Sequence, residues 1–184
     1  MANHNKMRNA EYYELQNCFD DLFAKSKKGC VFTRLMDIIA SESNIRLAYR
    51  NVKRNKGSYT AGVDKINICD IKKLDIKQYI NIFQEKLNWY IPQAVKRIEL
   101  KKETGGKRPL GIPTISDRLV QQCILQVLDP ICDAKFHTRN NGYRTNRAPE
   151  HAIAQCYDMI INKKMLFVVD VTRPLSSRQW KKQK

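Results

Sequence analysis

Apolar residues recur with helical spacing along the first part of the chain. The first stripe, within residues 6–27, consists of Leu15, Phe19, Leu22 and Phe23. The lysines and Gly29 that follow this stripe are typical of a helix C-terminus. A second helical region, residues 33–55, is predicted to break in its middle, where Ser43 can cap the second half. Cations followed by Gly57 are expected to end that half. The pattern therefore predicts that the chain begins with a set of helices.

A third helix is predicted over residues 71–90, and after it the spacing changes to alternation. Residues 93–102 alternate imperfectly between apolar and charged side chains, as expected of an exposed strand. The glycines within 103–106 supply a turn, and residues 107–112 return as a second strand. Because Pro109 has no N–H to donate, this strand is expected at a sheet edge. Together these segments predict a β-hairpin.

The last part of the chain predicts two more helices and a strand. Ser116 can cap the first helix, which is long and has one apolar face. That face consists of Leu119, Val120, Cys123, Ile124, Val127 and Leu128. A polar loop at 140–151 leads into the second helix, and residues 165–169 predict a buried strand. The inward residues of the second helix are expected to be Ala152, Ile153, Cys156, Met159 and Ile160. This order of elements predicts a mixed α/β fold of the α+β kind.

The composition is that of a globular protein with a large excess of positive charge. The chain has 184 residues, of which 42% are hydrophobic, and its formal net charge is +16. Such an excess favours a polyanionic partner through phosphate contacts, although charge alone leaves an ordinary basic protein as an alternative. The longest apolar run, residues 165–169, is far shorter than the ~20 residues that span a bilayer. No membrane partner is therefore expected.

The six cysteines do not predict a metal site. They form no CxxC pair, and the three histidines are isolated from one another and from any cysteine pair. Cys123 and Cys156 fall on apolar helix faces, so we expect buried free thiols in a reducing compartment.

Cations gather near the tip of the predicted hairpin. Arginine offers a planar fork for phosphate oxygens, and lysine offers a mobile point charge. A solvated charged face is the alternative interpretation of such a strand. The hairpin cations are Lys101, Lys102, Lys107 and Arg108. Arg118 begins the helix that follows, and Arg144 and Arg147 lie in the next loop.

Several blocks of the sequence resemble one protein family. The run KKETGGKRPLGIPTISDRLVQQCILQVLDPI, followed by NNGYRTNRAPEHAI and MLFVVDV, resembles the fingers and early palm of a reverse transcriptase. The type it resembles is the multifunctional reverse transcriptase/maturase encoded within group II introns. AYRNVKRNKGSYTAGVD resembles the block that precedes the fingers in that family. One block would be weak evidence, but the ordered set across residues 44–171 is specific.

The resemblance implies the N-terminal part of a right-hand reverse transcriptase. Its expected organisation is a helical extension at 1–43, fingers with a truncated palm at 44–171, and a divergent, disordered basic tail at 172–184. A full-length member would copy RNA into DNA and assist the splicing and mobility of its intron RNA. The residues implied to bind the nucleotide or template are Lys101, Lys102, Lys107, Arg108, Arg118 and Arg144. The residues implied to bind RNA are Lys53, Arg54, Lys56 and Arg147.

The sequence departs from the family where the catalytic metal would bind. Polymerase chemistry in the family uses Mg²⁺ held by aspartates, in a pattern that resembles VVDVDIKGFFD. This chain has VVDVTRPLSSRQW, so Thr172 stands at the position of the catalytic carboxylate. A threonine hydroxyl cannot replace an anionic ligand for a hard dication, and Asp170 could serve only in a slipped register. We therefore expect no intact catalytic site, no bound metal and no polymerase activity in a fragment interrupted at about residue 171.

Two other hypotheses stand beside a truncated reverse transcriptase/maturase. The chain could be a non-catalytic RNA-binding protein that holds structured intron RNA, or a decayed product without a selected role. The partners expected from the resemblance are group II intron RNA and an RNA/DNA primer–template. A cytoplasmic location in a bacterium is expected, with an organellar matrix as the alternative.

Overall fold

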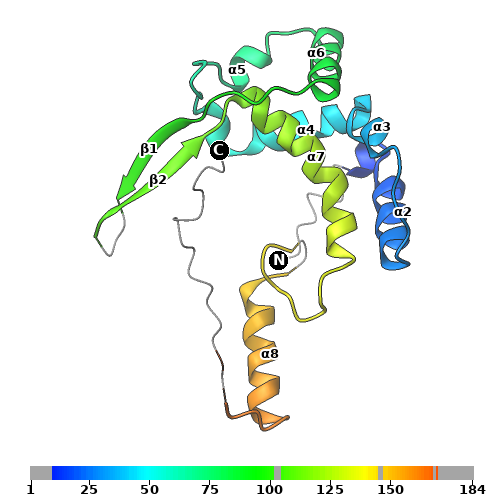
Figure 1. The fold of residues 1–184 in the computed structure, drawn as a ribbon, viewed down its shortest axis with the longest axis vertical. Helices are drawn as coiled ribbons and strands as arrows, with labels where there is room; N and C mark the ends of the chain where they lie inside the picture. Colours follow the sequence, from blue (N-terminus) through cyan, green and yellow to red (C-terminus); the bar gives the residue numbers. More distant parts are fainter. Residues whose placement is uncertain (1–9, 102–104, 145–146, 168, 170–184) are drawn as a thin grey trace, which may run out of the picture. The chain divides into compact units, whose positions relative to one another are not determined.

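The computed structural model describes residues 10–101, 105–144, 147–167 and 169 (Figure 1). These residues belong to two compact units, and the boundary between them along the chain lies between Thr138 and Arg139. The fold is mostly helical with one two-stranded antiparallel hairpin, so the predicted α+β mixture is confirmed.

The first unit contains most of the elements. Its elements are α2 (Gln16–Lys27), α3 (Leu35–Ile39), α4 (Glu42–Arg54), the 3₁₀ helix η1 (Lys56–Tyr59), α5 (Ile68–Ile71), α6 (Ile76–Asn88), β1 (Lys96–Lys101), β2 (Lys107–Ile112) and α7 (Ile115–Asp133). A short helical stretch at residues 10–12 precedes α2. The second unit contains α8 (Pro149–Ile161).

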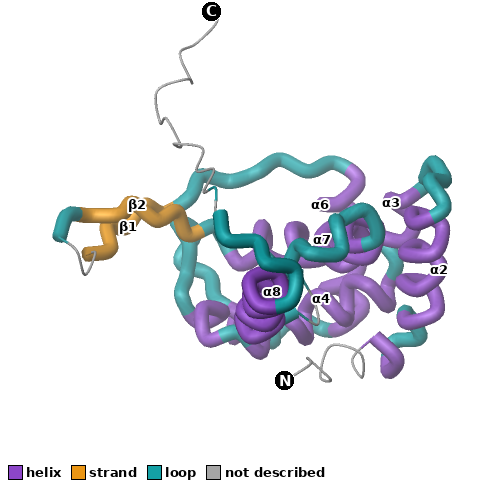
Figure 2. Tube along the Cα trace, turned by 90° about the horizontal axis from the view of Figure 1, so that it is seen from below, coloured by secondary structure: helices purple, strands orange, loops and turns teal. Residues whose placement is uncertain are grey.

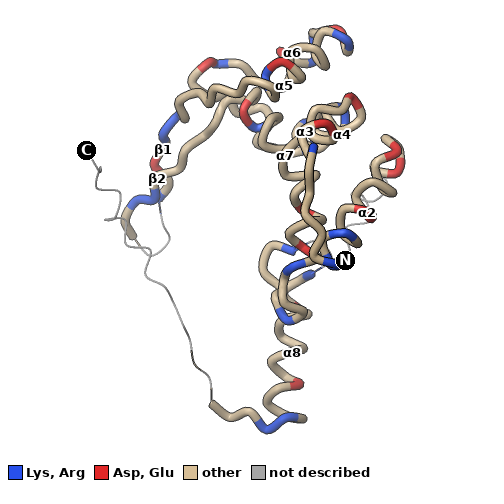
Figure 3. The backbone as a smooth tube through the Cα atoms, turned by 45° about the vertical axis from the view of Figure 1, so that its right-hand side comes forward, with Lys and Arg blue, Asp and Glu red and all other residues tan. Residues whose placement is uncertain are grey.

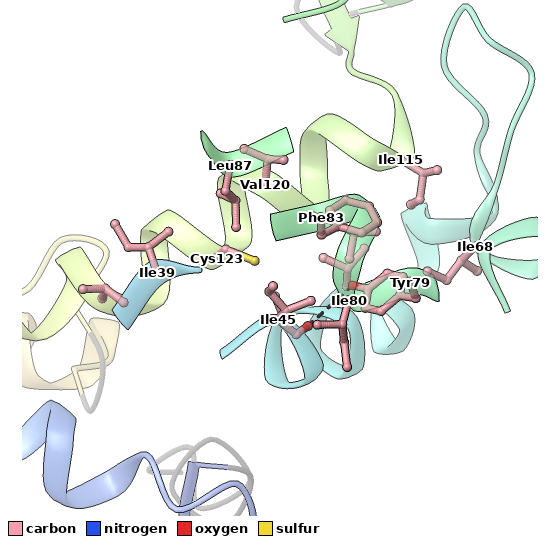
Figure 4. Packing of buried hydrophobic residues seen from close by; sticks show 14 of the residues in the cluster. Ile39, Ile45, Ile68, Tyr79, Ile80, Phe83, Leu87, Ile115, Val120 and Cys123 are labelled. Carbon is pink, nitrogen blue, oxygen red and sulfur yellow. Dashed lines mark hydrogen bonds between the residues drawn. The ribbon is translucent and has the colours of Figure 1, made fainter. Parts of the chain in front are cut away.

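The core of the first unit lies where α4, α6 and α7 meet. Ile45 of α4, Phe83 of α6 and Val120 of α7 are almost fully buried in one cluster (Figure 4). Full burial of an aliphatic or aromatic side chain of this size contributes roughly 1.5–3 kcal/mol. The predicted apolar face of α7 is confirmed at its centre, although Leu128 is exposed. The long helix α7 is therefore the element against which the others are organised.

The hairpin extends away from the helices of the first unit (Figure 2). Its strands pair from Lys96 with Ile112 to Lys101 with Lys107, and Pro109 lies opposite Glu99. Gly105 and Gly106 have φ of 85° and 86°, a left-handed conformation that glycine adopts without strain. The predicted hairpin and its edge position for Pro109 are confirmed.

The first predicted helix is interrupted at Glu14 and resumes as α2. Its predicted start at residue 6 lies outside the described residues, and the chain breaks at Glu14, whose φ is 59°. This left-handed residue lets Leu15 pack with Ala10 and Leu47 in a small second cluster before α2 begins. The stripe residue Phe23 is exposed rather than inward.

Two predicted helix caps were wrong by two residues. Ser41, not Ser43, accepts from the backbone N–H of Asn44 and starts α4, and Ser43 lies inside the helix. Thr114, not Ser116, accepts from the N–H of Asp117 and starts α7. In both cases an extended residue just before the helix offers the side-chain oxygen that the first free N–H groups need.

Two other predicted boundaries also differ. Gly57 does not end α4, because Asn55 is its C-terminal cap and Gly57 lies inside η1. The helix predicted over 71–90 is two helices, α5 and α6, separated by a turn. Asp75 ends that turn and accepts from the N–H of Lys77, so α6 starts anew at this cap.

The second unit contradicts two predictions of burial. No residue of α8 is buried, and Ile153 and Cys156, which were expected to point inward, are exposed. Residues 165–167 and 169 form no strand and are exposed. A strand needs a hydrogen-bonding neighbour, and the strands among the described residues, β1 and β2, pair with each other. Within the described part of the chain, no helix combines the length and apolar character required to cross a membrane.

Candidate nucleic-acid interface

The cations of the hairpin are exposed and divide between its two faces. Side chains alternate along a strand, and directly opposed residues share a face. Lys101 and Lys107 are opposed, so they lie on one face together with Glu99. Arg108 is opposed to Leu100 and lies on the other face. The register therefore brings Lys101 and Lys107 together but places Arg108 on the reverse of the ribbon. Figure 3 colours the Lys and Arg positions along the two strands blue.

The acidic residue of the hairpin contacts one of these lysines. Lys107 Nζ lies 2.6 Å from Glu99 Oε2, and their side chains are 67% and 62% exposed. An ion pair so open to water stabilises the fold by less than about 1 kcal/mol, so Lys107 can exchange Glu99 for a phosphate at little cost. Lys102 lies outside the described residues.

A second group of cations lies at the end of α4 and in η1. Lys53, Arg54 and Lys56 are all exposed. Lys53 Nζ lies 5.7 Å from the ring centroid of Tyr49, and its backbone carbonyl accepts from the Ser58 hydroxyl at 3.4 Å. These cations therefore lie at the end of α4, where the buried Ser58 side chain binds the backbone.

Arg118 joins this segment to the start of α7. Its Nη1 and Nη2 donate to the carbonyls of Gly57 and Thr60 at 2.7 Å and 2.6 Å. Its Nε donates to the carbonyl of Pro113 at 3.0 Å. A guanidinium is suited to such bridging because its donors form a rigid planar fork. The predicted role of Arg118 in a nucleotide or template pocket stays a prediction, and the structure shows its present partners to be three backbone carbonyls.

Ser116 and Asp117, which precede Arg118, form hydrogen bonds with α6 and with the segment that leads from α6 into β1. Asp117 is buried and accepts from the Tyr90 hydroxyl at 3.0 Å and from the Gln93 N–H at 3.3 Å. Burial, followed by the hydrogen bond to Asp117, raises the pKa of the Tyr90 phenol. Lys86 Nζ donates to Ser116 Oγ at 3.1 Å. Asp117 was not predicted from the sequence to be a functional residue. The pattern that could have indicated it is an acidic residue in the first turn of a predicted helix.

The remaining predicted cations lie in the second unit. Arg144 Nη1 donates to the carbonyl of Asn140 at 3.3 Å, and the N–H of Arg147 donates to the carbonyl of Arg144 at 3.4 Å. Arg147 is exposed just before α8. Their predicted roles in binding stay predictions.

The predicted metal position cannot be built from the described residues. Asp170 and Thr172 lie outside them. Across the ranges that are described, no three His, Cys, Asp or Glu side chains form a group that could hold a metal ion.

Comparison with known proteins gives three informative similarities, while no family model matches. Protein YkfC of Escherichia coli K12 is 34% identical over 123 residues, which are 65% of this chain and 32% of that protein. The group II intron-encoded protein LtrA of Lactococcus lactis is 32% identical over 124 residues, 67% of this chain and 20% of LtrA. A 91 kDa protein in the cob intron of Schizosaccharomyces pombe is 31% identical over 147 residues, 77% of this chain and 18% of that protein. The chain thus spans less than a third of the length of these relatives.

Proposed function

Because the chain belongs to the family of group II intron-encoded reverse transcriptase/maturase proteins, of which it spans only part, we propose that it binds structured intron RNA through its exposed cations. The observation that supports this most is the presence of two exposed basic groups attached to one helix end. The hairpin enters α7 directly, and the end of α4 is tied to α7 by Arg118.

The chemistry of the two groups suits a phosphate backbone. Their lysines and arginines are exposed, and a net charge of +16 attracts a polyanion at long range. Phosphate contacts release condensed counterions, so binding of this kind weakens steeply as salt is added. We propose Lys101, Lys107 and Arg108 as the hairpin contacts, and Lys53, Arg54 and Lys56 as those beside α4.

The proposal is tested by the binding of a transcribed group II intron RNA, measured by fluorescence anisotropy at several salt concentrations. Replacing Lys101, Lys107 and Arg108 by alanine should weaken binding more than about tenfold and lower the salt slope of log K by about two. Replacing Lys25, Lys27 and Lys28 together by alanine is the matched control for charge, since these are three exposed cations at the end of α2 outside the proposed contacts. It should change affinity less than about twofold.

Other outcomes separate the alternatives. If the wild-type chain binds the intron RNA no better than polyuridine of equal length, binding of structured RNA is refuted, and absence of binding to both favours a decayed product. We also propose that the chain does not extend a primer, because Thr172 stands where the family carries a carboxylate. Template-dependent extension in the presence of Mg²⁺ would overturn this second statement without affecting the first.

A further inference from the structure

The start of α7 holds three separate parts of the first unit. Ser116, Asp117 and Arg118 follow one another, and each accepts from or donates to a different segment. Ser116 accepts a hydrogen bond from Lys86 of α6. Asp117 accepts hydrogen bonds from Tyr90 and Gln93, which lead into β1. Arg118 donates to Gly57 and Thr60, which follow the basic end of α4. One helical turn therefore sets where both basic groups lie.

The segment after α4 is fixed at a second point that does not involve Arg118. A Cβ added to Gly62 would lie 2.8 Å from Thr114 Cα and 3.0 Å from Thr114 N. These are backbone atoms of the residue that caps α7, so they cannot move aside as a flexible side chain could. Gly57 differs, because a Cβ there would meet no atom within 4 Å. Residues 55–62 are thus held by a side-chain bridge at one end and by close backbone contact at the other.

Resting on the proposed function, we propose that Arg118 is a positioning residue for RNA binding rather than a phosphate ligand. Its guanidinium holds residues 55–62 against α7, so that the cations beside α4 keep a fixed position relative to the hairpin, which enters the same helix. A surface already ordered before binding loses less conformational entropy when RNA arrives. A direct contact with phosphate would require Arg118 to leave carbonyls that it contacts at 2.6, 2.7 and 3.0 Å.

Two substitutions release the segment by different routes. Arg118→Lys keeps the charge but loses the fork that reaches several carbonyls at once. Gly62→Ala changes no charge and pushes the backbone away from Thr114. Arg97→Lys is the matched control for the first substitution, at an exposed position of β1 outside the proposed contacts. Gly57→Ala is the control for the second, in the same segment and with open space around it.

The first measurement is amide hydrogen exchange in the free protein. The N–H groups of Ser58 and Thr60 donate to carbonyls within the segment at 2.9 Å and 3.0 Å. Arg118→Lys and Gly62→Ala should each speed exchange across residues 55–62 by about tenfold or more, as expected when a local structure opens more readily. Both controls should leave this exchange as in the wild type. Unchanged exchange in Arg118→Lys and Gly62→Ala would overturn the inference.

The second measurement is affinity for the intron RNA and its salt dependence. Both releasing substitutions should weaken binding about tenfold and lower the salt slope by about one or more, because the cations beside α4 no longer meet phosphates together. A phosphate ligand would behave differently: Arg118→Lys would keep the slope and Gly62→Ala would have no effect. That pattern, or faster exchange with unchanged affinity, would refute the positioning role.

Failure of the proposed function gives a distinct result. A wild-type chain that does not bind RNA refutes that function and, with it, the role of Arg118 in binding. Hydrogen exchange would still decide whether Arg118 and Gly62 hold residues 55–62 in place.

Discussion

Asn44 is a polar residue at the centre of an apolar interface. Its Nδ2 donates to the carbonyls of Ile39 and Cys123 at 2.9 Å and 3.0 Å. Its Oδ1 accepts from Gln126 Nε2 at 2.7 Å, and Asn51 donates to Gln126 Oε1 at 2.8 Å. Buried amides are stable only when paired in this way. The sequence could not reveal the pairing, because Asn44 and Gln126 are 82 residues apart.

Asn44→Leu should destabilise the fold by about 2–4 kcal/mol, since two carbonyls and the Gln126 amide would lose a partner inside the core. Urea unfolding followed by circular dichroism measures the change. Asn81→Leu makes the same replacement at an exposed position of α6 and should alter the free energy of unfolding by less than about 0.5 kcal/mol. Equal stability of the two variants would show that the buried network contributes nothing specific.

At the scale of elements, the existence of helices and hairpin followed from periodicity, but their ends did not. Each of the two wrongly placed N-terminal caps offered two residues able to cap, such as Ser41 and Ser43 before α4. The choice depends on which residue the core needs inside the helix. Asn44 lies in the first turn that Ser41 caps, and from there its side chain donates to the carbonyl of Cys123 in α7. Such a constraint comes from another element and is absent from local pattern.

The caps give a paired prediction. Ser41→Ala should lower stability by about 1 kcal/mol, because the N–H of Asn44 loses its acceptor. Ser43→Ala places a better helix former inside α4 and should be neutral or slightly stabilising. Thermal unfolding of the two variants under identical conditions compares them. A larger loss from Ser43→Ala would restore the position first predicted from the sequence.

At the scale of the whole molecule, burial is unevenly distributed. The buried apolar residues of the described part lie between Ala10 and Val127, all within the first unit. The residues of α8 expected to point inward have helical spacing, and sequence alone predicted that they would be covered. Periodicity specifies which face is apolar, but burial also needs a surface to pack against, and the described residues of the second unit supply none. The cations of the candidate interface were predicted from the sequence and stay predictions as RNA contacts. The contacts of Asp117 and Gly62 were not predicted, because they arise only from tertiary structure.

This distribution predicts that the first unit folds without the second. A chain ending at Thr138 keeps every residue of the main core cluster, from Leu22 to Val127. Its thermal midpoint should lie within about 4 °C of that of the full chain, a difference of less than ~1 kcal/mol for a domain of this size. A chain ending at Pro113 lacks α7 and should show no cooperative transition, because Leu119, Val120 and Cys123 leave the core. Loss of cooperative unfolding in the chain that ends at Thr138 would mean that residues after 138 stabilise a core to which they contribute no buried side chain among those described.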